Sequence, residues 1–254
     1  MKSAFRCETG FVRESNQDAV FCSDTPLGSL PNLYIVADGM GGHRAGDIAS
    51  QETIRVLTDF IRTAPASGSA PDEILDRALK AANSHVYRLA TEQAEYMGMG
   101  TTFVGAVVTE KEVCIANVGD SRLYCLYADS RGLERITEDH SVVQELIKAG
   151  EITEEEAKIH PSRHMITRAL GTDSEVQVDF FQLPRAGVRK LLLCSDGLTN
   201  MVEDEEIRCI LQRTQEAEET AQQLTEAALA AGGRDNISVI ILTEMGGNGD
   251  ADER

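Results

Sequence analysis

Apolar and polar residues alternate with two different periods along this chain, and the change of period separates strands from helices. Runs with strand character are predicted over 19–22, 33–37, 102–109, 113–118, 122–127, 176–183, 188–194 and 237–242. Apolar positions at helical spacing predict helices over 47–61, 71–93, 204–213 and 217–231. This order is not the regular strand–helix alternation of a parallel sheet, and it favours antiparallel sheets with helices packed outside.

A polar, helix-rich stretch from residue 138 to about 171 interrupts the strand pattern. Within it, Thr153 and Glu156 form a capping-box pattern that predicts the start of a helix. We interpret the stretch as an insertion between sheet elements. Residues 1–243 form the predicted catalytic domain, and the polar tail 244–254 is expected to be disordered.

The composition excludes several classes of protein. With 254 residues, 42% of them hydrophobic, the chain can bury a large core. Its formal charge of −18 disfavours sequence-independent binding to nucleic acids and to anionic membranes. The six cysteines form no C-x-x-C pair, which indicates buried small hydrophobes in a reducing compartment. No signal peptide or run of transmembrane length is visible, so a cytoplasmic protein is expected.

Four aspartates stand in short breaks beside hydrophobic runs, each with a glycine or an asparagine within two residues. They are Asp18, Asp38, Asp196 and Asp235. Carboxylates that converge from separate strands are how proteins hold hard divalent cations such as Mg²⁺ or Mn²⁺. Each aspartate alone is an ordinary turn or cap residue. Together they match a two-metal cluster that activates water for an in-line displacement.

The sharpest motif begins at Asp38. A carboxylate that leaves a buried strand there can bridge two cations, and Gly39 lets its carbonyl approach one of them. An ordinary Asp-Gly turn is the alternative. His43 is a candidate proton donor to the leaving alkoxide, although a lone histidine in a loop is more often just solvated.

Two further residues extend the candidate site. Arg13 can hold a phosphate as a planar fork. Asp120, in a Gly-Asp break between strands, is a candidate ligand of an additional cation, with a tight hairpin turn as the alternative. The histidines of the polar stretch share no spacing and are interpreted as structural: His140, His160 and His164.

One pattern points to a different chemistry. Cys7 and Arg13 satisfy C-x5-R, the spacing of cysteine-dependent phosphatases. That chemistry needs a tight loop of backbone amides leading into a helix N-terminus, which lowers the pKa of the thiol. A strand follows here instead, so we interpret the spacing as a coincidence.

As an ordered series, these residues resemble the metal-dependent serine/threonine protein phosphatases of the PPM, or type-2C, family in its bacterial form. The matching segments span nearly the whole chain, and they are 13–18, 38–43, 100–102, 118–122, 137–141, 167–171, 195–198 and 235–238. The resemblance implies an α+β fold in which two packed antiparallel β-sheets are flanked by helix pairs, an α-β-β-α sandwich. It also implies that 139–171 is a helical flap that affects substrate choice.

The resemblance implies two Mn²⁺ or Mg²⁺ ions per subunit. Asp38 would bridge them, with the Gly39 carbonyl on the second ion. Asp196 and Asp235 would hold the first ion, and Asp18 would position water on the metal site.

The same resemblance implies that Arg13 clamps the substrate phosphate and that Asp120, with Asp196, binds a weaker third ion. Gln17 stands where animal members carry a glutamate. His43 lies four residues beyond Gly39, whereas animal members have a histidine directly after that glycine. The bacterial pattern shares both departures.

The implied function is hydrolysis of phosphoserine and phosphothreonine in proteins, by direct attack of a metal-bridging hydroxide on phosphorus. Substrates implied by the resemblance include a cognate serine/threonine kinase, which makes this a signalling enzyme. A monomer is the expectation. The alternative function is a catalytically silent pseudophosphatase that binds phosphoproteins without turnover.

Overall fold

The computed structural model of the chain describes residues 1–42, 45–64 and 68–245. His43 and most of the predicted tail lie outside these residues. No helix within the described ranges is long and apolar enough to cross a membrane.

The chain forms two β-sheets in which every neighbouring pair of strands is antiparallel. The five-stranded sheet, called sheet A below, has the order β1 (Lys2–Glu8), β11 (Ile237–Thr243), β10 (Val188–Cys194), β7 (Arg122–Tyr127) and β8 (Leu133–Arg135). The six-stranded sheet, called sheet B, has the order β2 (Asp18–Ser23), β3 (Leu33–Met40), β5 (Phe103–Val108), β6 (Glu112–Val118) and β9 (Asp179–Pro184), with β4 (Gly100–Thr101) paired to β3.

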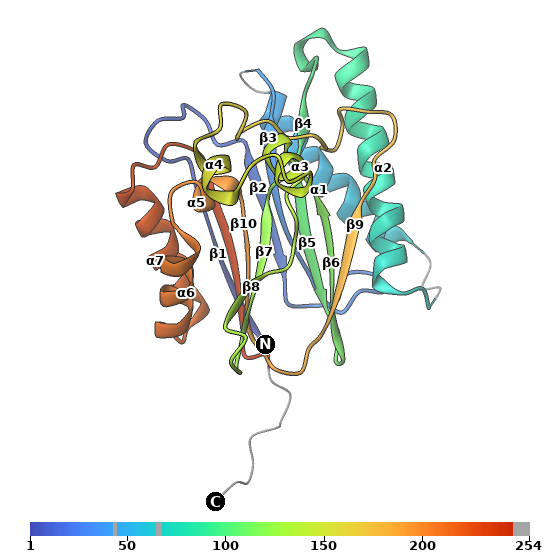
Figure 1. Cartoon of the computed structure of the whole chain (residues 1–254). Helices are drawn as coiled ribbons and strands as arrows, with labels where there is room; N and C mark the ends of the chain where they lie inside the picture. The colour runs from blue at the N-terminus through green and yellow to red at the C-terminus, as the bar shows by residue number, and fades with distance from the viewer. Residues whose placement is uncertain (43–44, 65–67, 246–254) are drawn as a thin grey trace, which may run out of the picture.

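Helices cover the outer face of each sheet, so the molecule has four layers (Figure 1). The helices on sheet B are α1 (Ala45–Thr63) and α2 (Pro71–Glu92), with a short 3-10 turn, η1 (Ala94–Tyr96), after them. Those on sheet A are α5 (Asp196–Thr199), α6 (Asp204–Arg213) and α7 (Ala217–Ala230). This arrangement is the predicted α-β-β-α sandwich.

Buried apolar side chains fill all three spaces between the layers. Tyr34, Leu193 and Ile240 belong to the core between the two sheets. Leu57 of α1 and Leu79 of α2 pack against the outer face of sheet B. Ile207 of α6 and Leu224 of α7 pack against the outer face of sheet A. Each such fully buried side chain contributes about 1.5–3 kcal/mol relative to exposure, which explains why the amphipathic periodicity predicted the helices well.

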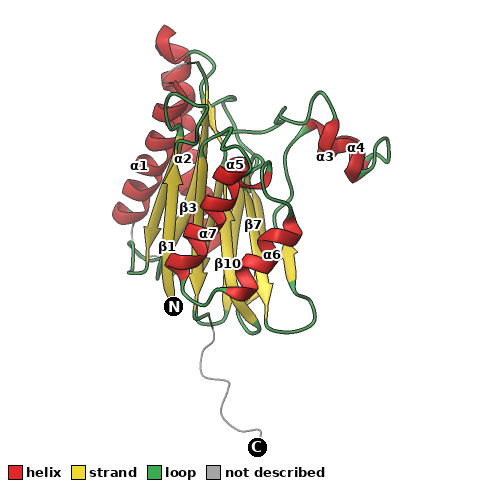
Figure 2. Ribbon diagram, turned by 90° about the vertical axis from the view of Figure 1, so that its left-hand side faces the viewer, coloured by secondary structure: helices red, strands yellow, loops and turns green. Residues whose placement is uncertain are grey.

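The polar stretch forms a separate projection that belongs to neither sheet. Figure 2 shows α3 (Val142–Lys148) and α4 (Glu154–Ile159) standing out from the body of the sandwich. The capping box at Thr153 is present, since its side chain accepts from the Glu156 amide and Glu156 accepts from the Thr153 amide. Both ends of the stretch return to the same place, where the Thr167 amide donates to the His140 carbonyl at 2.8 Å.

Two strand predictions require correction, and the strands β1, β4 and β8 were not predicted. The run ending at residue 37 continues as β3 through Asp38 to Met40, because β2 and β4 supply hydrogen-bonding partners there. The strand predicted from residue 176 begins at Asp179, where pairing with Asn117 starts. β1 was not predicted, because its sequence KSAFRCE is only weakly apolar, as expected of a strand at a sheet edge.

Candidate metal and phosphate site

The strand register brings the predicted aspartates to one end of the sandwich. Asp18 lies directly opposite Asp38 in the β2–β3 pair. Cys194 lies opposite Val239 on one side and opposite Arg122 on the other. The segments that carry Asp120, Asp196 and Asp235 therefore leave or enter sheet A at the same end of its strands. Because the five aspartates come from both sheets, the packing of the two sheets assembles the site.

The Asp18 carboxyl group is buried and only half satisfied. The Ser195 hydroxyl, on the opposite sheet, donates to Asp18 Oδ2 at 2.7 Å. Asp18 Oδ1 is buried without a hydrogen-bonding partner. Burial, opposed by the Ser195 hydrogen bond and reinforced by neighbouring carboxylates, raises the pKa of Asp18 to about 7. An unpartnered buried oxygen of this kind fits a cation or a water molecule as its partner.

Asp38 stands beside Asp18 on the same face of sheet B, since directly opposite residues of an antiparallel pair share a face. Its backbone is fixed, because its amide donates to Thr102 Oγ1 at 2.9 Å and its carbonyl accepts from Thr101 Oγ1 at 2.9 Å. Burial, and then the charges of Asp18 and Asp196, raise the pKa of Asp38 well above its ordinary value. Each carboxylate therefore disfavours the ionised form of the other, and a positive charge between them would offset that repulsion.

Gly39 allows helix α1 to approach this strand closely. A Cβ atom at Gly39 would lie 2.0 Å from the Gly46 carbonyl oxygen and 2.6 Å from that of Gln17. Any larger residue would push the first turn of α1 away from β3. The glycine therefore has a packing role in addition to the metal-binding role that the resemblance implies for its carbonyl.

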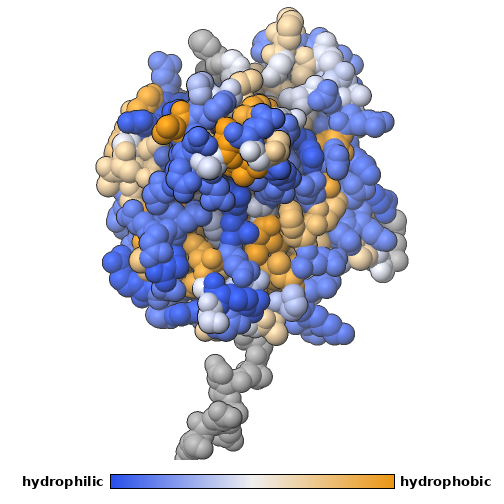
Figure 3. Space-filling model, viewed as in Figure 1, coloured by the Kyte–Doolittle hydropathy of each residue, from blue (hydrophilic) through white to orange (hydrophobic). Residues whose placement is uncertain are grey.

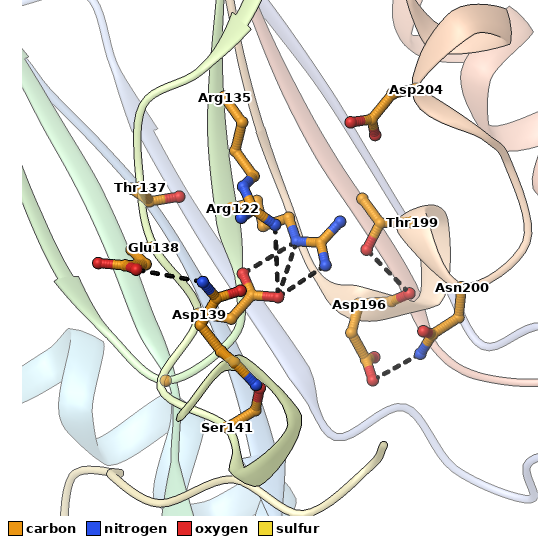
Figure 4. Close-up of polar contacts among 12 residues, drawn as sticks. Arg122, Arg135, Thr137, Glu138, Asp139, Ser141, Asp196, Thr199, Asn200 and Asp204 are labelled. Carbon is orange, nitrogen blue, oxygen red and sulfur yellow. Dashed lines mark hydrogen bonds and ion pairs between the residues drawn. The ribbon is translucent and has the colours of Figure 1, made fainter. Parts of the chain in front are cut away.

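Asp196 and Asp235, at one end of the strands of sheet A, have polar partners. Asn200 Nδ2 donates to Asp196 Oδ2 at 2.9 Å, as Figure 4 shows. Arg13, in the β1–β2 loop, donates from Nη2 to Asp235 Oδ2 at 2.7 Å. Burial, and then the charge of Asp235, raise the pKa of Asp196. Arg13, predicted to hold a phosphate, is thus brought directly to the acidic cluster.

Asp120 follows Gly119 in the β6–β7 turn, close enough to the others for their charges to act on it. Burial, followed by the charges of Asp196 and Asp139, raises the pKa of Asp120 to about 8. The structure therefore brings together the described aspartates of the predicted site, together with Arg13, while His43 lies outside the described residues.

The carboxylates lie near one another, but their oxygens do not converge on a common position. Among the described residues, no three histidine, cysteine, aspartate or glutamate side chains already form a set of metal ligands. Arg13 binds one carboxylate oxygen of Asp235, and Asn200 binds one of Asp196. A cleft of about 570 Å³ elsewhere, beside β1, is lined by Phe5, Cys7 and other residues but by none of these aspartates. Charge, and not cavity size, identifies this site.

Several residues that position the site were quoted in the motifs without a role. Ser195 also accepts from the Ser238 amide at 3.0 Å, so one hydroxyl joins β11 to Asp18. Arg122 binds Asp139 with Nε and Nη2, at 2.9 and 2.6 Å to its two oxygens (Figure 4). Position beside a motif aspartate is the signal that could have found Ser195.

His140 was interpreted as structural, and it is buried in a hydrogen-bond network. Its Nδ1 accepts from the Gly119 amide at 2.9 Å, and its Nε2 lies 3.1 Å from Asp179 Oδ2. Burial lowers the pKa of this histidine. His140 therefore fixes the turn before Asp120 to the root of the polar stretch.

The cysteine pattern has the wrong surroundings for nucleophilic catalysis. Cys7 lies in β1, and its sulfur accepts from Asn16 Nδ2 and Ser238 Oγ, both at 3.2 Å. Burial raises the pKa of its thiol, which disfavours the thiolate. Arg13 is directed to Asp235, so the C-x5-R spacing carries no phosphate loop.

A largely desolvated acidic cluster beside an arginine, at one end of an α-β-β-α sandwich, is the arrangement expected of a metal-dependent phosphate-ester hydrolase. The family model for protein phosphatase 2C matches residues 12–231. The serine/threonine phosphatase stp of Listeria innocua is 40% identical over 246 residues, which are 95% of each chain. The protein phosphatase PhpP of Streptococcus pneumoniae is 35% identical over 244 residues, covering 96% of this chain and 97% of its own.

Solved structures agree with the sequence relatives. A crystal structure of a bacterial serine phosphatase has a TM-score of 0.88 and 40% identity, covering 96% of this chain and 97% of its own. The catalytic domain of the phosphatase PstP, in complex with two manganese ions, has a TM-score of 0.80 and 37% identity, covering 94% and 96%. The chain belongs to the protein phosphatase 2C family, and it is a serine/threonine protein phosphatase. The comparisons give no support to a catalytically silent pseudophosphatase.

Proposed function

We propose that the aspartates at this end of the sandwich hold divalent cations for hydrolysis of phosphoserine and phosphothreonine. Asp38 would bridge two ions, Mn²⁺ or Mg²⁺, with the Gly39 carbonyl on the second and with Asp196 and Asp235 on the first. Asp120, together with Asp196, would hold a third. The observation that carries the proposal is the pair of buried Asp18 and half-buried Asp38, directly opposite each other, with Asp18 Oδ1 lacking a partner.

The chemistry of the donors fits the cations. Hard divalent ions take carboxylate and carbonyl oxygens, and the proposed donors are of these types. When bound, such ions lower the pKa of coordinated water and offset the charge of the phosphoryl group. The raised pKa values of Asp18, Asp38, Asp120 and Asp196 are what uncompensated burial of acids produces. The PstP relative that binds manganese supports the same assignment.

Arg13 would hold the phosphate of the substrate. Its side chain is 51% exposed at the rim, and one nitrogen is engaged by Asp235. The guanidinium is a planar fork with further donors, so it can bind two phosphate oxygens in parallel. A cation on Asp235 would weaken the pull of that carboxylate on Arg13 and release the arginine for substrate.

Asp18 would orient the attacking water. Ser195 fixes one of its oxygens at 2.7 Å and leaves the other free to accept a hydrogen bond from water. Attack on phosphorus is then direct, since the buried Cys7 thiol is not available as a nucleophile. His43 stays the candidate proton donor to the leaving oxygen.

The segment 139–171 would act as the flap that affects substrate choice. Its two ends are joined at His140, and its helices α3 and α4 stand outside both sheets. The catalytic domain would then comprise residues 1–243. We further propose a monomeric, cytoplasmic enzyme that reverses a cognate serine/threonine kinase. The six cysteines, all free of disulfides, support a reducing compartment.

The test is phosphate release from a phosphothreonine peptide by EDTA-stripped protein, with and without Mn²⁺. Activity should return with Mn²⁺ in the wild type and in Cys7→Ser. Arg13→Ala should lower kcat/KM by about 10²-fold, through the loss of a charge-assisted bidentate contact. Arg62→Ala is the matched control, because Arg62 is 53% exposed and also pairs with an aspartate. Activity without metal that depends on Cys7 would overturn the proposal.

A further inference from the structure

Two consecutive apolar side chains lie exposed directly before Arg13. Phe11 is 72% exposed and Val12 is 65% exposed, whereas apolar side chains of this size are mostly covered elsewhere in the described chain. The other strongly exposed large apolar residues are isolated from one another in sequence: Phe5, Met97, Ile159 and Met165. Figure 3 shows that the face of the molecule drawn there is mainly hydrophilic and carries separate apolar patches. Adjacent exposed apolar residues beside a binding site indicate an interaction surface.

The loop that carries these residues is fixed at both ends. Asn236 Nδ2 donates to the carbonyls of Thr9 and Ser15, at 2.9 and 3.0 Å. The Phe11 amide donates to the Gly233 carbonyl at 2.7 Å. The backbone of the loop is therefore tied to the turn before β11, and its exposed side chains project from a fixed position.

Gly10 brings this loop against the backbone that carries Asp235. Its φ is +78°, and a Cβ atom there would lie 2.3 Å from the Asp235 carbonyl oxygen. Phe11, Val12 and Arg13 are thus held at a set place relative to the acidic cluster. A surface that is already ordered before binding loses little conformational entropy when a ligand covers it.

We propose that the surface formed by Phe11 and Val12 binds an apolar side chain of the phosphoprotein substrate, one or two residues from the phosphorylated serine or threonine. The inference rests on the proposed role of Arg13 in holding the phosphate. Consecutive Cα atoms are about 3.8 Å apart, so the neighbours of a phosphoresidue held by Arg13 reach the residues that precede Arg13. The net charge of −18 makes acidic neighbours of the phosphoresidue unfavourable. An apolar neighbour is the one that the exposed side chains of Phe11 and Val12 complement.

The experiment uses two phosphothreonine peptides that differ only at the residues on either side of the phosphothreonine, with leucine in one and serine in the other. Metal-loaded wild-type enzyme should show a kcat/KM about tenfold higher for the leucine peptide, mainly through KM. In the double variant Phe11→Ser/Val12→Ser the ratio should fall to about one. Phe11→Leu, which keeps an apolar side chain, should retain the preference. Met97→Ser is the matched control, because Met97 is 74% exposed on another segment.

The ratio between the peptides is the readout, so a general loss of activity or folding does not imitate the expected result. Equal kcat/KM for both peptides in the wild type, or a preference that survives in the double variant, would overturn the inference. So would a change of oligomeric mass in the double variant with an unchanged ratio, which would assign the surface to self-association. Failure to release phosphate from either peptide with Mn²⁺ would instead overturn the proposed function.

Discussion

The aspartates contributed by the two sheets lie at the same end of the sandwich but in different surroundings. On sheet B, buried Asp18 and half-buried Asp38 lie opposite each other on neighbouring strands, with one oxygen of Asp18 unpartnered. At the edge of sheet A, Asp196 and Asp235 have partners in Asn200 and Arg13. The charges of the pair on sheet B are therefore the less compensated by groups of the protein itself. The pair on sheet A is already partly satisfied by the protein.

The most direct test of this difference between the two pairs is to neutralise one carboxylate of each. Asp38→Asn should lower kcat/KM by about 10³-fold, because it removes the proposed bridging ligand. In metal-free protein the same change should raise the free energy of unfolding by roughly 1–3 kcal/mol, because like-charge repulsion in a buried site is relieved. Thermal unfolding in EDTA and steady-state kinetics measure the two effects.

Asp235→Asn is the matched variant on sheet A. It should also lower activity, but its metal-free stability should change by less than about 1 kcal/mol, since a partly exposed ion pair contributes little. If Asp38→Asn destabilised the metal-free protein as much as an ordinary core substitution, the proposed repulsion on sheet B would be wrong.

The pH dependence of the metal-free protein sharpens the comparison. The folded-state pKa is about 7 for Asp18 and about 8 for Asp120, against about 3.9 in an unfolded chain. The folded state therefore binds more protons between about pH 4 and pH 8, and stability falls as pH rises through that window. We expect a loss of several kcal/mol in EDTA, because each unit of pKa shift corresponds to about 1.4 kcal/mol. Saturating Mn²⁺ should remove most of this slope, and a flat profile in EDTA would contradict the assignment.

A last expected effect, on stability and not on a proposed metal ligand, comes from the hydroxyl that joins the two sheets. Ser195→Ala removes the donor to Asp18 Oδ2 and leaves the buried Ser238 amide without its acceptor. The free energy of unfolding should fall by about 2 kcal/mol. Ser84→Ala is the control, because Ser84 is exposed and its hydroxyl donates only to the Lys80 carbonyl. Equal stability of the two variants, by chemical denaturation, would show that Ser195 does not couple the sheets.

The elements that could be predicted are those with a strong apolar period. Helices α6 and α7 and strand β7 begin at the predicted residues because their apolar faces pack against a core. Strand β1 was missed because it is a weakly apolar edge strand, and its pairing with β11 joins residues more than 200 positions apart. The end of β3 was missed because strand pairing, not local sequence, extends it through Asp38.

The sequence by itself determined the layered α+β architecture and the identity of the acidic residues and Arg13. These follow from local periodicity and from the types of side chain present in short breaks. Tertiary structure decided which of these residues meet. It placed Asp18 opposite Asp38, it gave Asp18 the hydroxyl of Ser195, and it turned Arg13 towards Asp235 instead of towards Cys7. The physical reason is that register, burial and hydrogen-bond partners depend on strands that are distant in sequence, and these contacts set the pKa values on which the chemistry depends.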